Sequence, residues 1–146
     1  MQKTAPTEIL YTAEATAEDG GREGHVRSSD GTLDLQLSRP VAFRGKGGEG
    51  TNPEQLFAAG YSACFASALG RKGRETRRST KGATVTARVG IGPIDEGAFG
   101  LDVELDVHVP ELERAEAEEL AALAHEVCPY SNATRGSLDV RVNVVD

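Results

Sequence analysis

The chain has 146 residues and a formal net charge of −7 at neutral pH, with 38% hydrophobic and 27% charged residues. This size suits one domain, and we expect residues 1–146 to form a single domain that buries its own core. The acidic balance argues against nucleic-acid binding, which depends on a basic surface. No apolar stretch approaches the ~18 residues of a membrane span, and the N-terminus lacks the apolar region of a signal peptide. We therefore expect a cytoplasmic protein that binds neither nucleic acid nor membranes.

The first third of the sequence predicts an antiparallel meander of three strands. Residues 7–17 contain β-branched and aromatic residues and precede a glycine-containing turn. Residues 25–28 can pair back after that turn, and residues 32–37 alternate apolar and polar side chains as a half-buried strand does. The glycine-rich loop 45–50 lacks the Gly-Lys-Ser/Thr ending of a phosphate-binding loop, so that function is excluded.

The next segment predicts a helix with a well-marked start. Asn52 suits the capping position, Pro53 fits the first helical position, and Gln55 completes a spacing like that of a capping box. We expect the helix to reach about Leu69 or beyond. Its many alanine, glycine and serine residues have small side chains, which allow neighbouring elements to approach closely. The helix is therefore expected to lie buried against a sheet and a partner helix.

Two strands, a helix and a final strand complete the pattern. Residues 85–91 and 101–109 alternate on either side of a Gly/Pro-containing connection, which predicts a hairpin. An amphipathic helix is expected over about 111–127, and residues 138–144 alternate again. The expected fold is an α+β domain with a mostly antiparallel sheet, in the order β-β-β-α-β-β-α-β, and two principal helices.

The two cysteines lie in unlike settings. Cys64 is about three turns inside the first helix, too far from its start for the helix dipole to stabilise a thiolate. Burial alone would make this thiol inert, so a nucleophilic Cys64 requires a cation from elsewhere in the chain. Cys128 is expected at the end of the second helix, where partial negative charge disfavours a thiolate. This difference suggests that Cys64 attacks and Cys128 resolves, whereas the alternative is that both are small buried hydrophobic residues.

Other cysteine chemistries have less support. A zinc site would need more clustered Cys and His residues than the chain has, so no metal is expected. The two cysteines stand far apart, which excludes a thioredoxin-like motif. A cysteine hydrolase would need a base, and His25, His108 and His125 have no distinguishing context.

Two long blocks of sequence resemble the organic hydroperoxide resistance (Ohr) branch of the OsmC/Ohr family. They are GTNPEQLFAAGYSACF at residues 50–65 and VCPYSNATRG at residues 127–136. Residues 20–22 (GGR) and 29–31 (SDG) resemble the N-terminal pattern of the family, and the order and intervals match over nearly the whole chain. Residues 61–65 (YSACF) favour Ohr, because the OsmC branch usually has a His-Ala-x-Cys-Phe pattern there.

The resemblance implies a thiol peroxidase that reduces organic hydroperoxides to alcohols. It makes Cys64 the peroxidatic cysteine and Cys128 the resolving one, with a disulfide between them during turnover. Arg22 matches the catalytic arginine of the family and Glu54 the glutamate that pairs with it. A guanidinium held by a carboxylate would supply the cation that Cys64 requires.

The resemblance also implies a pocket and partners. Phe57, Tyr61, Phe65 and Phe99 are candidates for an apolar pocket that takes alkyl or lipid hydroperoxides, although core packing is the alternative for each, and at least as good an explanation for Phe99. No bound cofactor is expected. The expected external reductant is dihydrolipoamide on a lipoylated protein, or another dithiol, and the expected assembly is an intertwined homodimer.

Three alternative functions are open. The first is an OsmC-type peroxidase with a broader peroxide range. The second is a non-catalytic redox-sensing or ligand-binding dimer in which the disulfide alters partner binding. The third, a hydrolytic cysteine enzyme, lacks a convincing base.

Overall fold

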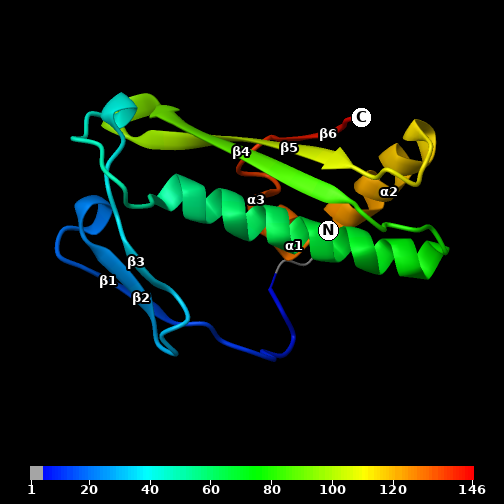
Figure 1. Cartoon of the computed structure of the whole chain (residues 1–146), viewed down its shortest axis with the longest axis horizontal. Coiled ribbons are helices and arrows are strands. Elements are labelled where there is room, and N and C mark those ends of the chain that lie inside the picture. Colours follow the sequence, from blue (N-terminus) through cyan, green and yellow to red (C-terminus); the bar gives the residue numbers. More distant parts are fainter. Residues whose placement is uncertain (1–4) are drawn as a thin grey trace. The chain divides into compact units, whose positions relative to one another are not determined.

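The computed structural model describes residues 5–146 (Figure 1). The chain divides into two compact units, Met1–Leu56 and Phe57–Asp146. Helix α1, Pro53–Thr76, begins in the first unit, and most of its length belongs to the second. That residues 1–146 act as one domain stays a prediction.

The first unit contains the expected three-stranded meander. Strands β1 (Ala15–Glu18), β2 (His25–Ser28) and β3 (Asp34–Gln36) pair antiparallel in the order β1-β2-β3. A short 3-10 helix, η1 (Gly21–Glu23), connects β1 to β2, and a second, η2 (Val41–Phe43), follows β3. The predicted order of these elements is confirmed.

The ends of these strands differ from the prediction. The strand expected over 7–17 begins only at residue 15, because the four residues of β2 pair with Ala15–Glu18 and the ladder ends one residue earlier, where the Ser29 N–H donates to the Glu14 carbonyl oxygen. An alternating or β-branched sequence forms a strand only where a partner offers backbone groups.

Helix α1 begins as predicted. The Asn52 side chain accepts a hydrogen bond from the Gln55 backbone N–H at 2.8 Å, which confirms the N-cap. The Gln55 side chain accepts from the Thr51 hydroxyl, also at 2.8 Å, instead of closing a capping box. The helix continues past Leu69 to Thr76.

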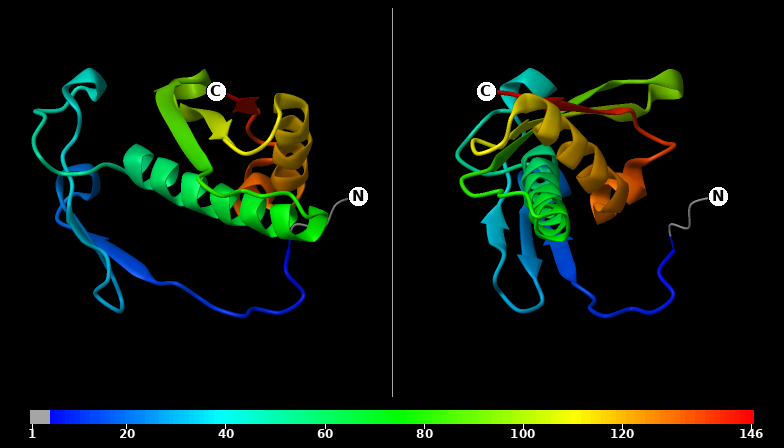
Figure 2. Two further views of the ribbon diagram at one scale, coloured as in Figure 1. Left: turned by 45° about the vertical axis from the view of Figure 1, so that its right-hand side comes forward. Right: turned by 90° about the vertical axis from the view of Figure 1, so that its right-hand side faces the viewer.

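The second unit is a three-stranded sheet with helices on one of its faces (Figures 1 and 2). Its elements are β4 (Thr84–Pro93), η3 (Asp95–Gly97), β5 (Phe99–His108), α2 (Arg114–Val127), α3 (Pro129–Thr134) and β6 (Val140–Val144). Strands β4 and β5 form the expected antiparallel hairpin, and β6 pairs parallel to β5. The mixed α+β class and element order are confirmed, but the short helix α3 was not predicted.

The core of this unit lies between the sheet and the helices. Alternate residues of β5 are fully buried and face apolar side chains of α1 and α2. The principal members are Tyr61, Phe65, Leu69, Val103, Leu105, Val107, Leu120 and Ala124. Small residues on both helices allow close packing, which compensates for the absence of tryptophan.

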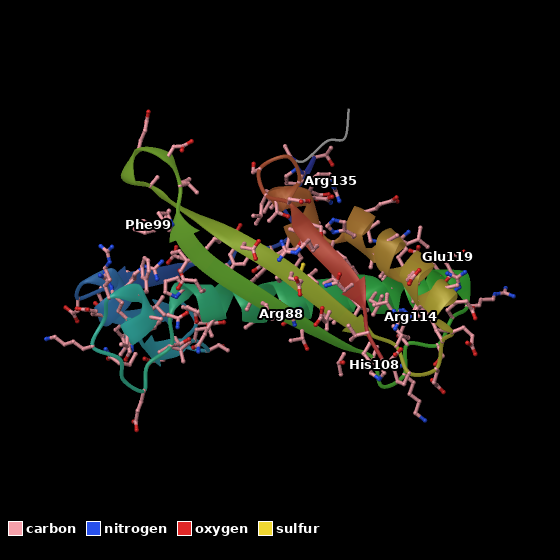
Figure 3. All side chains as sticks on the ribbon, turned by 90° about the horizontal axis from the view of Figure 1, so that it is seen from above. Arg88, Phe99, His108, Arg114, Glu119 and Arg135 are labelled. Carbon is pink, nitrogen blue, oxygen red and sulfur yellow. The ribbon has the colours of Figure 1, made fainter. Side chains whose placement is uncertain are left out.

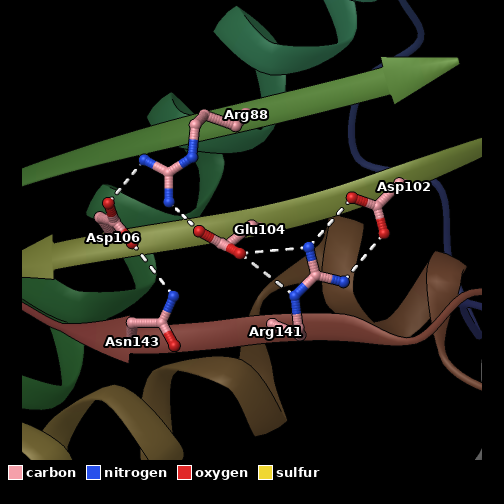
Figure 4. Close-up of polar contacts among 6 residues, drawn as sticks. All are labelled: Arg88, Asp102, Glu104, Asp106, Arg141 and Asn143. Atoms are coloured by element: carbon pink, nitrogen blue, oxygen red, sulfur yellow. Dashed lines mark hydrogen bonds and ion pairs between the residues drawn. The ribbon is translucent and has the colours of Figure 1, made fainter.

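The opposite face of the sheet is charged (Figure 4). Arg88 donates to Asp106 at 2.6 Å and to Glu104, and Arg141 donates to Asp102 at 2.8 Å and to Glu104. Hydrogen bonds from the arginines lower the pKa values of all three carboxyl groups. The sheet thus has one apolar and one ionic face, which explains the alternation in its strands.

Candidate active site

The structure brings the two cysteines together. The Sγ atoms of Cys64 and Cys128 lie 3.7 Å apart, and neither cysteine is in a disulfide. Cys64 is half-buried in α1, whereas Cys128 is fully buried at the junction where α2 ends and α3 begins. A disulfide needs an S–S distance of about 2.05 Å, so the sulfur atoms must approach by about 1.7 Å.

The surroundings of Cys64 within the second unit oppose ionisation. Burial is the largest influence and raises the pKa of the Cys64 thiol. A hydrogen bond from the Tyr130 backbone N–H acts in the opposite direction, and the neighbouring Cys128 raises the pKa again because two adjacent thiols cannot easily both carry charge. The amide comes from the first turn of α3, a contribution that the sequence did not predict.

A buried polar network lies beside the thiols. The Ser131 hydroxyl is 2.7 Å from the Tyr61 hydroxyl and 2.7 Å from His125 Nδ1. Burial lowers the pKa of His125, and the nearby positive charge of Arg135 lowers it further. The expectation that His125 has no special setting is therefore wrong. The spacing of His125, Cys128 and Ser131 at intervals of three residues is the signal that sequence reasoning missed.

Arg22 and Glu54 form a bidentate ion pair within the first unit. Arg22 Nη2 donates to Glu54 Oε1 at 2.6 Å and Nη1 donates to Oε2 at 2.9 Å, with the side chains 26% and 13% exposed. Gly20 and Gly21, both at positive φ, form the turn that presents Arg22, and the Phe43 ring centroid lies 5.0 Å from the guanidinium. The expected pairing is present, and the catalytic roles of both residues stay predictions.

The hydrogen bonds to Arg22 lower the pKa of the Glu54 carboxyl. Glu54 is therefore ionised at neutral pH and serves purely as an acceptor for the guanidinium. A bidentate pair of this kind fixes the orientation of the arginine as well as its position.

The four aromatic pocket candidates lie in different settings. Tyr61 and Phe65 are fully buried in the core, where they expose no surface to a ligand. Phe57 is partly buried, and its ring centroid lies 6.2 Å from that of Tyr130. Phe99 is 54% exposed at the start of β5 (Figure 3). Core packing thus accounts for the first two, and a role in binding stays a prediction for all four.

Within residues 5–146, no group of three or more His, Cys, Asp or Glu side chains is arranged to hold a metal ion. None of the helices in this part of the chain is both long and apolar enough to cross a membrane.

Comparisons with known proteins identify the family. The OsmC-like protein family matches residues 45–143. The chain is 50% identical over 141 residues to the organic hydroperoxide resistance protein of Xanthomonas axonopodis pv. citri (strain 306), covering 96% of this chain and 98% of that protein. It is 44% identical over 136 residues to organic hydroperoxide resistance protein OhrB of Bacillus subtilis (strain 168), covering 92% and 98%. The crystal structure of an organic hydroperoxide resistance protein from Legionella pneumophila matches with a TM-score of 0.90 at 47% identity, covering 95% of this chain and all of that one. In sequence and in fold, the chain belongs to the organic hydroperoxide resistance branch of the OsmC/Ohr family.

Proposed function

We propose that this protein is a cysteine-based peroxidase that reduces organic hydroperoxides to alcohols. The observation that supports the proposal most directly is the proximity of Cys64 and Cys128, whose sulfur atoms lie 3.7 Å apart although one cysteine is in α1 and the other is between α2 and α3. The relatives from Xanthomonas and Bacillus, both named for organic hydroperoxide resistance, support the same class of substrate.

The proposed cycle has three steps. The Cys64 thiolate attacks the terminal oxygen of the hydroperoxide, the O–O bond breaks, and the released alkoxide takes a proton to become the alcohol. Cys64 is left as a sulfenic acid. The Cys128 thiol then attacks that sulfur, expels water and forms the disulfide. A dithiol reduces the disulfide by exchange and becomes a disulfide itself.

Arg22 is the group that we propose activates Cys64. The cysteine's own surroundings raise its pKa, so a compensating cation is needed for reaction at neutral pH. A guanidinium favours the thiolate and has N–H groups left over to donate to the peroxide oxygens. Glu54 would keep Arg22 in the orientation that this task requires, since it holds both terminal nitrogens.

The proposed substrate is an alkyl or lipid hydroperoxide, and the proposed reductant is a dithiol such as dihydrolipoamide on a lipoylated protein. A dithiol suits a buried disulfide because its second sulfur releases the mixed disulfide without a further collision. A reducing compartment such as the cytoplasm would return both cysteines to thiols between cycles.

We further propose that the protein acts as a homodimer. Ile9, Leu10 and Tyr11 are consecutive large apolar residues that are 66%, 89% and 79% exposed. A second copy of the chain would bury them. Sedimentation equilibrium at micromolar concentration should give twice the mass of one chain, and a monomer would contradict this assembly.

The catalytic proposal is tested by measuring cumene hydroperoxide consumption with dihydrolipoamide as reductant. Cys64→Ser should abolish consumption, because no sulfur remains to attack. Cys128→Ser should react with the first equivalent of peroxide and then accumulate sulfinic acid on Cys64, detected by intact mass. Full turnover by Cys64→Ser would refute the mechanism.

The same assay separates the alternative functions. Equal efficiency with hydrogen peroxide and cumene hydroperoxide would favour an OsmC-type peroxidase of broader range. Oxidation of Cys64 without turnover by any dithiol would favour a redox-sensing dimer.

A further inference from the structure

We propose that Tyr61, Ser131 and His125 form a polar clasp that positions Cys128 against Cys64 for disulfide formation. All three are positioning residues, since none of their hydrogen-bonding atoms is bonded to either sulfur. The inference rests on the proposed two-cysteine cycle, in which none of these three residues has been given a step.

The clasp is centred on the Ser131 hydroxyl. This group has one proton to donate and lone pairs to accept with, and it lies 2.7 Å from both the Tyr61 hydroxyl and His125 Nδ1. Tyr61 and Ser131 are fully buried. Buried polar groups with satisfied hydrogen bonds specify one arrangement of the elements that carry them, because any other arrangement leaves a group unpaired.

The clasp sits one helical turn from each thiol. Tyr61 precedes Cys64 by three residues on α1, His125 precedes Cys128 by three residues on α2, and Ser131 follows Cys128 by three residues in α3. Tyr61 and Cys64 share a face of α1 at this spacing. Cys128 is the extended residue that caps the end of α2 and the start of α3, so His125 and Ser131 flank it from the two helices. The clasp therefore joins the three helices next to the two positions where the sulfur atoms meet.

A further polar contact between these helices is longer, with 3.4 Å between the Tyr61 and Thr134 hydroxyl oxygens, and the aromatic contacts near the thiols lack such direction. The rings of Tyr61 and Tyr130 are 5.6 Å apart at a tilt of 55°, and those of Phe65 and His125 are 6.4 Å apart at 43°. Apolar and aromatic contacts tolerate small sliding movements, whereas hydrogen bonds weaken steeply with misalignment. We infer that the clasp, more than the apolar packing, sets the separation of the two sulfur atoms.

This positioning matters because the cysteines are 64 positions apart in the chain. Holding their sulfur atoms at 3.7 Å leaves only a small approach to the covalent bond, so the resolving step has a high effective concentration of the second thiol. Fast resolution also limits further oxidation of the Cys64 sulfenic acid to sulfinic acid. The same packing of α3 lets the Tyr130 backbone N–H donate a hydrogen bond to the Cys64 sulfur.

The test measures the equilibrium between the Cys64–Cys128 dithiol and its disulfide in glutathione redox buffers, which requires no peroxidase activity. Ser131→Ala should lower the effective concentration of the thiol pair about tenfold, as expected if one well-aligned buried hydrogen bond is lost. Tyr61→Phe, which removes only the hydroxyl, should have a similar effect. The double variant should lose little more than either single variant, because both changes break the same unit.

Ser62→Ala is the matched control. Its hydroxyl lies on α1 close to Cys64 and, among residues 5–146, donates a hydrogen bond to the Ala59 carbonyl oxygen of its own helix at 3.1 Å. It should leave the effective concentration unchanged. A purely structural role for the clasp would destabilise the dithiol and disulfide forms equally and leave this equilibrium unmoved, although it would lower the free energy of unfolding.

The outcomes separate the clasp from the peroxidase proposal. Effective concentrations within about twofold of wild type for both Ser131→Ala and Tyr61→Phe would overturn the clasp, since that change is too small for a lost buried hydrogen bond. If Ser131→Ala does not fold, the volume-conserving Tyr61→Phe decides. If Ser131→Ala or Tyr61→Phe lowers the effective concentration while the wild-type protein consumes no hydroperoxide, the clasp is supported and the peroxidase proposal is rejected.

Discussion

Oxidation of Cys64 and Cys128 to a disulfide is expected to raise the free energy of unfolding by about 3–4 kcal/mol. The bond would close a loop between residues 64 positions apart, and the loss of chain entropy in the unfolded state is worth about 4.3 kcal/mol at that length. Part of this gain is offset, because the sulfur atoms must move closer from 3.7 Å in a packed environment. For a chain of this size the net change corresponds to a rise in Tm of about 6–16 °C.

The measurement is urea unfolding of the oxidised and reduced proteins, followed by far-UV circular dichroism because the chain has no tryptophan. Intact mass under denaturing conditions confirms the redox state of each sample. Cys128→Ser is the control, and its stability should not differ between oxidising and reducing buffers.

Equal stability of the oxidised and reduced wild-type protein would refute this reasoning. It would mean that the disulfide strains the folded protein as much as it constrains the unfolded chain. By linkage, the stabilisation also makes the disulfide harder to reduce in the folded protein, which is consistent with a strongly reducing dithiol as the proposed partner.

Two further predictions concern Arg22, the proposed activating cation, and the C-terminal part of α1. Arg22→Gln should slow alkylation of Cys64 by iodoacetamide at neutral pH by about tenfold or more, because the thiolate loses its proposed counter-charge. The control Arg27→Gln removes the same charge from an exposed ion pair and should change the rate little, and equal rates in the two variants would contradict the role of Arg22. Gly73→Ala should destabilise the protein by about 1–3 kcal/mol, since a Cβ there would lie 2.8 Å from a backbone carbonyl oxygen and 2.7 Å from a threonine methyl group. Gly70→Ala, whose Cβ would meet nothing closer than 3.6 Å, should instead stabilise the protein by up to about 1 kcal/mol. Urea unfolding measures both changes, and free energies of unfolding that shift in the same direction for the two variants would contradict this prediction.

Much of the fold was predictable because it depends on local patterns. The period-two alternation of β4, β5 and β6 follows from a sheet with one apolar and one ionic face. Asn52 and Pro53 mark the start of α1 through backbone groups within the same turn. The strand expected over 7–17 was too long because its extent depends on a partner strand far from it in the chain.

The sequence by its own patterns indicated the order of the predicted elements and the unlike settings of the two thiols. The pairing of Arg22 with Glu54 was expected only from the resemblance to the family, and the structure contains it. The groups that surround those thiols became apparent from the folded structure. The approach of Cys128 to Cys64, the hydrogen bond from the Tyr130 amide to Cys64 and the hydrogen bond between Tyr61 and Ser131 all join segments that are distant in sequence. The physical reason is that burial and hydrogen-bond partners are properties of packed helices together, and no single segment contains them.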